Sequence, residues 1–260
     1  MRQREPEGPP PAPAVQKLRI RYAKRGRLRF SSTRDFQRAL ERALRRADVP
    51  MAFSAGFHPH PKISYANAAA TGTASEAEYV EISVTERLDP GVVRAALDAA
   101  LPVGLDVLEV VEAAPGALAD RLQASEWVIA LRGMPLAQVR EAAETFRGET
   151  RVEVTRVLKA GPRTFDARAA VVEVTVDTAD SEVILAGVVP AECAILRLVV
   201  RHTTPAVRPD DVLTALRESI GFAPARPPRV TRLAQGPWDR ATGQVADPLA
   251  PDKDAAASSR

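Results

Sequence analysis

Residues 17–47 read KLRIRYAKRGRLRFSSTRDFQRALERALRRA. Apolar and basic side chains alternate over 17–23, and this period of two predicts a half-buried strand with a basic outer face. The hydroxyl residues at 31–33 can cap a helix, and apolar residues recur after them at helical spacing to about Ala47. The stretch therefore predicts a strand, a turn at residues 24–27, a return to strand over residues 28–30 and then an amphipathic helix.

The side of this helix opposite its apolar face is basic, at 100° per residue. Its arginines are Arg34, Arg38, Arg42, Arg45 and Arg46. Residues 16–50 hold twelve Lys/Arg and three acids, a charge of +9, whereas residues 51–260 sum to −6. A basic field on an acidic body indicates a polyanionic partner, either nucleic acid or an acidic protein surface, or else a solvated face.

A second distinctive stretch, residues 53–65, reads FSAGFHPHPKISY. It contains His58 and His60, and its alternate prolines keep the backbone extended. Four interpretations remain open at this level. The loop could hold a metal, could perform acid–base catalysis with Lys62 stabilising a phosphate, could contact RNA, or could simply pack its aromatic side chains into the core.

The order of strand and helix patterns predicts an α+β fold of two consecutive ferredoxin-like modules with antiparallel sheets. We place these modules at 16–115 and 125–222. A Pro-rich leader at 1–15 and a Pro-, Ala-, Asp- and Ser-rich tail at 236–260 are predicted to be disordered.

Composition excludes several classes of protein. The chain has 260 residues, 45% of them hydrophobic, which is enough to bury a sizeable core. Its single cysteine, Cys193, allows no intrachain disulfide and no cysteine cage for zinc or iron–sulfur. No apolar run can span a membrane and the N-terminus has no signal-peptide pattern, so we expect a cytoplasmic protein. No nucleotide-binding or hydrolase motif occurs, and we expect no cofactor and no metal.

Several separated motifs occur in a fixed order along the first part of the chain. They are GRLRFS at 26–31, RALRRA at 42–47, GFHPHPKIS at 56–64 and EYVEI at 78–82. Together they resemble the bacterial radical-SAM-linked domain of unknown function. The resemblance implies a domain that occurs alone or joined to a radical-SAM enzyme and carries no iron–sulfur machinery itself. A separately encoded radical-SAM enzyme is then an expected partner.

The leading hypothesis is a non-catalytic RNA-binding or RNA-modification accessory protein. The residues expected to bind phosphate are Arg19, Arg21, Arg27, Arg29, Arg38, Arg42 and Lys62, with Phe57 or Tyr65 stacking on a base. One alternative is a protein-docking subunit of a radical-SAM enzyme. The other is a histidine-dependent nuclease or hydrolase that uses His58, His60 and Lys62.

Overall fold

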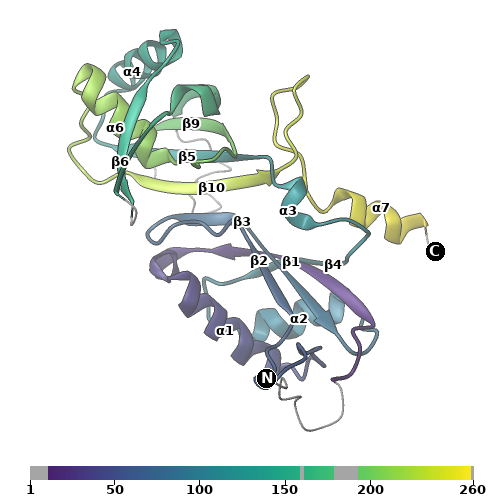
Figure 1. Ribbon diagram of the computed structural model, residues 1–260. Coiled ribbons are helices and arrows are strands. Elements are labelled where there is room, and N and C mark those ends of the chain that lie inside the picture. The colour runs from purple at the N-terminus through teal and green to yellow at the C-terminus, as the bar shows by residue number, and fades with distance from the viewer. Residues whose placement is uncertain (1–10, 159–160, 179–192, 259–260) are drawn as a thin grey trace, which may run out of the picture. The chain divides into compact units, whose positions relative to one another are not determined.

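The computed structural model describes residues 11–158, 161–178 and 193–258 (Figure 1). It is a mixed α/β structure with a large, mostly antiparallel sheet and, in the described residues, six α-helices. The chain divides into two compact units. Unit 1 comprises Met1–Gly72, Ala77–Asp120 and Leu249–Arg260, and unit 2 comprises Thr73–Glu76 and Arg121–Pro248.

Unit 1 has the strand order β4-β1-β3-β2. Its elements along the chain are β1 (Gln16–Lys24), the 3₁₀ helix η1 (Gly26–Phe30), α1 (Thr33–Arg46), β2 (Ile63–Ala66), β3 (Ala74–Val84), α2 (Pro90–Ala100), β4 (Val107–Glu112), α3 (Leu118–Arg121) and α7 (Ala250–Ser258). The apolar residues of β1 pack with those of α1 and α2 in one core, which contains Leu18, Ile20, Phe36, Leu40 and Leu97. The predicted strand and helix of residues 17–47 are therefore confirmed.

Helix α1 begins with a capping box. The Ser32 hydroxyl accepts the Asp35 backbone N–H at 3.2 Å, and the Asp35 carboxylate accepts the Ser32 backbone N–H at 3.1 Å. The Ser32 hydroxyl also donates to the Asp35 carboxylate at 2.7 Å, and this bond, together with the one from the Ser32 N–H, holds the pKa of Asp35 below its usual value. One local expectation differs, because Leu28 to Phe30 were predicted to resume a strand and instead lie in η1. Gly26, at φ +53°, turns the chain out of the extended conformation there.

Unit 2 has the strand order β10-β5-β9-β8, and the first residues of β3, Ala74 and Ser75, pair in parallel with β10. Its elements along the chain are β5 (Ala124–Arg132), α4 (Leu136–Gly148), β6 (Glu153–Leu158), β7 (Gly161–Asp166), the 3₁₀ helix η2 (Arg168–Ala170), β8 (Val171–Thr178), β9 (Cys193–Arg201), α6 (Pro209–Ile220) and β10 (Arg229–Gly236). β6 and β7 form a separate hairpin. The apolar faces of α4 and α6 contribute to the core of this unit.

The C-terminal part of the chain differs most from expectation. Composition predicted a disordered tail at 236–260 and a second module that ends at residue 222, but the structure has β10 after that point and α7 near the end. The side chains that these two elements bury include polar ones, namely Thr231 and Arg232 of β10 and Asp252 of α7. Apolar periodicity in the sequence therefore does not reveal either element. The predicted leader falls largely on residues 1–10, which lie outside the described residues.

Candidate nucleic-acid interface

One face of α1 presents a row of exposed arginines. Arg34, Arg38, Arg42 and Arg45 are exposed, whereas Phe36, Leu40, Ala43 and Leu44 are buried on the other side. In the part of the chain that the structure describes, no carboxylate lies within ion-pair distance of these four arginines. Their guanidinium groups therefore remain available for a planar anion such as phosphate.

An exposed aromatic ring lies just before the N-terminus of α1. Phe30, in η1, is 57% exposed, and the Arg29 guanidinium carbon lies 4.3 Å from the centre of its ring. The ring also approaches Gly72 closely enough that a side chain there would touch it at 3.8 Å. Arg27 is exposed in the same short helix. This end of α1 therefore combines a flat apolar surface with two cations.

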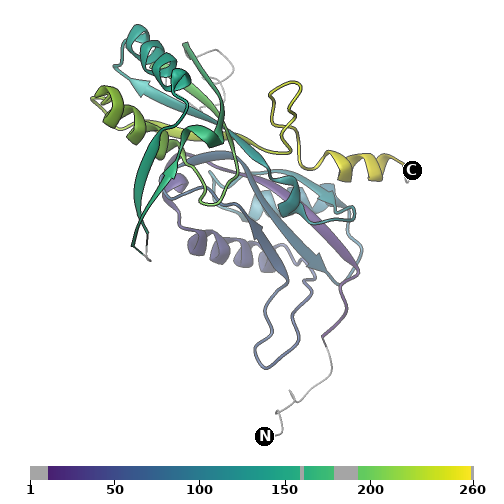
Figure 2. The same cartoon turned by 45° about the horizontal axis from the view of Figure 1, so that its top comes forward.

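The loop after α1 is a second aromatic and basic element. Residues 51–62 form a hairpin-like excursion in which the Ser54 N–H donates to the His60 carbonyl at 2.9 Å and the Lys62 N–H donates to the Ala52 carbonyl at 2.8 Å. The loop projects away from the sheet in Figure 2. Phe57 at its tip is 60% exposed, and Lys62 is exposed.

The two aromatic elements flank α1 along the chain. η1 ends three residues before α1 begins, and the loop starts five residues after α1 ends. The 14 residues of α1 span about 21 Å. Along the chain, the exposed arginines of α1 thus lie between Phe30 and the loop that carries Phe57. The sequence pattern indicated the arginines and Phe57 as contact residues, but not Phe30.

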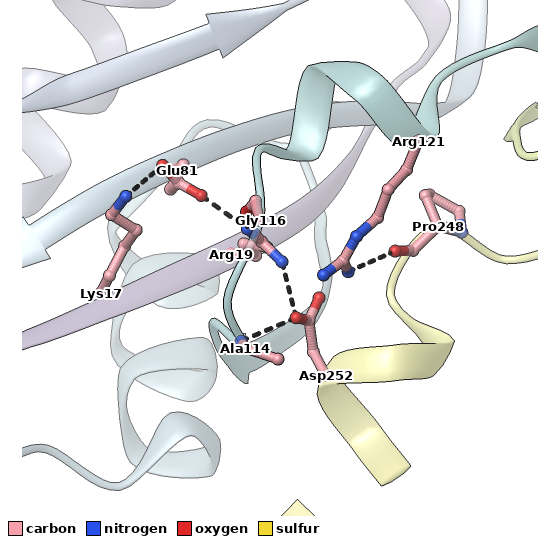
Figure 3. Close-up of polar contacts among 8 residues, drawn as sticks. All are labelled: Lys17, Arg19, Glu81, Ala114, Gly116, Arg121, Pro248 and Asp252. Carbon is pink, nitrogen blue, oxygen red and sulfur yellow. Dashed lines mark hydrogen bonds and ion pairs between the residues drawn. The ribbon is translucent and has the colours of Figure 1, made fainter. Parts of the chain in front are cut away.

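Arg19 is placed very differently from the other arginines. Its side chain is fully buried and its guanidinium binds the Glu81 carboxylate at 2.9 Å, the Asp252 carboxylate at 2.6 Å and the Gly116 carbonyl (Figure 3). Arg19 was expected to contact phosphate. Instead, its guanidinium N–H groups link β1 to β3, to α7 and to the segment before α3. Arg21, on the same strand face, is half-buried.

Tyr65, one of the two residues expected to stack on a base, also belongs to the interior. Its ring packs edge-on against Phe36, with 6.1 Å between ring centres. Its hydroxyl is buried and has no hydrogen-bond partner in the described part of the chain. Burial, with a smaller effect from the Glu41 carboxylate, raises the pKa of Tyr65 to about 12. Phe57 is therefore the exposed ring of this pair.

The two loop histidines are not assembled into a catalytic or metal-binding group. His58 and His60 are exposed, and among the described residues neither imidazole has a hydrogen-bond partner. The described residues also contain no group of three His, Cys, Asp or Glu side chains that could hold a metal. The geometry adds no support to the nuclease hypothesis.

The third histidine, His202, lies in unit 2 and is held by two hydrogen bonds that are partly buried. His202 Nε2 lies 2.7 Å from the Ser125 hydroxyl oxygen, and Nδ1 lies 2.7 Å from the Leu122 carbonyl oxygen. The carbonyl can only accept, so the Nδ1 proton is placed there and Nε2 accepts from Ser125. Burial lowers the pKa of His202, although the Leu122 hydrogen bond opposes this. Ser125 is buried and His202 is half-buried, so this pair holds the start of β5 to the segment that follows β9.

We expect His202 to make the protein less stable in acid. The unfolded chain takes up a proton near the ordinary pKa of 6.5, and the folded chain does so only at lower pH, so this stability is present above pH 6.5 and declines below it. Urea unfolding at about pH 8 and about pH 5 should show a smaller loss of stability on acidification in His202→Gln than in wild type. His58→Gln is the matched control. An equal pH dependence in wild type and His202→Gln would contradict the assignment.

No helix in the described ranges is both long enough and apolar enough to cross a bilayer.

A search of curated proteins found no match to the chain. Residues 17–209, which include β1, η1, α1, the 51–62 loop and most of unit 2, match a family described as an uncharacterized protein conserved in bacteria, DUF2344. The match spans most of the chain, and the protein belongs to this family.

Proposed function

We propose that the protein binds single-stranded RNA through unit 1, as a non-catalytic accessory protein. The observation that carries this proposal is the row of exposed arginines on α1, with exposed Phe30 in the short helix before α1 and exposed Phe57 in the loop that follows it. Guanidinium groups bind phosphates, and a flat exposed ring binds the face of a base. We define the RNA surface as Arg27, Phe30, Arg34, Arg38, Arg42, Phe57 and Lys62.

Single strands fit this surface better than a duplex does. The bases of a duplex are stacked on each other, so an aromatic side chain can reach only bases that are splayed out, as in single strands and loops. Phe30 and Phe57 are more than half exposed, and the cost of this apolar exposure is relieved when a base covers the ring. A surface used only for solubility has no need of either ring.

We further propose that each unit is a ferredoxin-like module. In unit 1 the order β1-α1-β2-β3-α2-β4 along the chain combines with the order β4-β1-β3-β2 in the sheet. In unit 2, β5, β8, β9 and β10 take the corresponding places, with α4 and α6 as the two helices. A βαββαβ chain with two helix crossovers supports this assignment in both units.

We also propose that the protein acts in the cytoplasm beside a separately encoded radical-SAM enzyme, as the motif resemblance implies. The support is the set of motifs from residue 26 to residue 82, together with a single cysteine, Cys193, which is buried. Affinity purification of the tagged protein, with and without RNase treatment, tests this partnership. An enzyme that remains bound after RNase treatment supports direct docking, and its absence from both samples rejects it.

The base-stacking part of the proposal predicts a loss of affinity without a change in charge. Phe57→Ala and Phe30→Ala should each weaken binding of a labelled uridine oligonucleotide by about tenfold, because base–aromatic stacking contributes about 1–3 kcal/mol. Fluorescence anisotropy measures the affinity. Val103→Ala, at a residue that is 97% exposed elsewhere in unit 1, is the control. Unchanged affinity in both phenylalanine variants would reject stacking.

A further inference from the structure

Strand β4 forms an outer edge of the sheet in unit 1. It pairs with β1 in antiparallel fashion, and in the described residues no strand pairs with its other side. The Ala113 N–H donates to the Lys17 carbonyl at 2.9 Å, so odd-numbered residues of this segment bond toward β1. By alternation, the backbone N–H and C=O groups of Val110 and Glu112 point away from β1.

Side-chain carboxylates cover both ends of this edge but not its middle. The Val107 N–H donates to the Asp98 carboxylate at 2.8 Å, and the Ala114 N–H donates to the Asp252 carboxylate at 2.8 Å. The outward amides between these two points have no such partner in the part of the chain that the structure describes. An unpaired strand edge is a template for another extended chain, and proteins usually block it.

A groove of about 1120 Å³ runs along this open edge. Five consecutive residues, 110–114, line it. Since successive strand residues face opposite sides of a sheet, a groove that touches all five follows the edge of the strand. One wall is the start of α2 at residues 89–91, and the other is the alanine run of α7 at residues 255–257.

Buried charge fixes the α7 wall in place. Asp252 in the first turn of α7 is 1% exposed and receives the Arg19 guanidinium at 2.6 Å as well as the Ala114 N–H (Figure 3). Lys253 pairs with Glu109 of β4 at 2.6 Å. A helix of nine residues is too short to be stable alone, so these contacts hold it beside β4. The rest of α7 is exposed, with its alanines along the groove.

We propose that this groove binds an extended peptide segment of a partner protein, which adds as a strand to β4. The outward groups of Val110 and Glu112 supply the main-chain hydrogen bonds. Alternate side chains of the peptide lie against the alanine wall, which favours apolar residues there. The groove shares no residue with the RNA surface, so the proposal of peptide binding does not depend on the proposal of RNA binding.

The test uses the full chain and peptides of about twelve residues selected from a random phage-displayed library. The best peptide is synthesised and its affinity is measured by anisotropy. Glu112→Pro removes an outward N–H that is not part of the β1 pairing, a position where an edge strand tolerates proline. Glu112→Gln keeps the N–H and is its matched control. Ala256→Trp fills the groove from α7 without altering β4.

We expect Glu112→Pro and Ala256→Trp each to weaken peptide binding at least tenfold, and Glu112→Gln to stay within about twofold of wild type. N-methylation removes a backbone N–H. Methylating the peptide nitrogens that face β4 should abolish binding, whereas methylating the alternate nitrogens, which point away from β4, should not. Failure to select any peptide would overturn the proposal, as would affinities unchanged in both Glu112→Pro and Ala256→Trp. Sedimentation that shows self-association lost in Glu112→Pro would also overturn it, since the occupant would then be a second copy of this chain.

Discussion

Reversing Arg38 and Arg42 to glutamate is expected to weaken binding of single-stranded RNA about a hundredfold. Both side chains are exposed on α1 without an ion-pair partner in the described residues. Each of the two substitutions therefore removes a phosphate contact and adds a negative charge that repels phosphate. The plot of log Kobs against log salt should become shallower by about 1.4, because each contact with a single strand contributes about 0.7. Anisotropy titrations over a range of salt concentrations give both quantities.

The matched control for this charge reversal is Arg140→Glu together with Arg147→Glu. Both arginines are exposed on α4, seven residues apart, so the control changes net charge by the same amount on one helix of unit 2. We expect only a modest loss of affinity and an unchanged salt slope in this control. If the two double variants lose affinity equally, the binding reflects overall charge, and the surface on α1 is rejected.

Arg19→Met is expected to destabilise the protein by about 3–5 kcal/mol. The substitution leaves the Asp252 carboxylate buried without its cation and removes one partner of Glu81. Urea or thermal unfolding measures the loss. Lys17→Met is the control, because Lys17 pairs with the same Glu81 at 3.0 Å but its side chain is 53% exposed. A surface pair contributes only about 0–1 kcal/mol.

A rescue variant separates buried charge from simple loss of packing at Arg19. Arg19→Met combined with Asp252→Leu should recover much of the stability, since removing both charges avoids an unpaired buried ion. If Arg19→Met is as stable as wild type, the network drawn in Figure 3 does not hold α7 in solution. A destabilised Arg19 variant that also fails to bind RNA would say nothing about phosphate contacts.

Periodic apolar patterns made the first strand and helix predictable, whereas buried polar anchors hid the last elements. Leu18, Ile20, Phe36 and Leu40 repeat with periods that match the strand and the helix. β10 buries Thr231 and Arg232, and α7 is anchored through Asp252, so neither has a clear apolar face. A basic–apolar alternation also placed Arg19 on the face away from the helices. It could not show that a helix more than 200 residues later covers that face.

The residues of the candidate site were likewise predictable only in part from the sequence. The arginine row on α1 follows from the 3.6-residue period, and the structure places those side chains outside. Phe57 and Tyr65 looked equivalent in the sequence, but β2 turns Tyr65 toward Phe36 while Phe57 lies at an exposed loop tip. Phe30 was missed because its stretch was expected to form a strand, and only the turn into η1 leaves its ring exposed.

The central claim is that unit 1 binds single-stranded RNA through phosphate and base contacts. The most direct measurement is the affinity of the purified chain, stripped of nucleic acid, for a uridine RNA of about twelve nucleotides between about 50 and 300 mM salt. With Arg27, Arg34, Arg38, Arg42 and Lys62 each at a phosphate, we expect a log–log slope of about −3.5 and weaker binding of a duplex of equal length. No binding at the lowest salt, or a slope near zero, would contradict the claim.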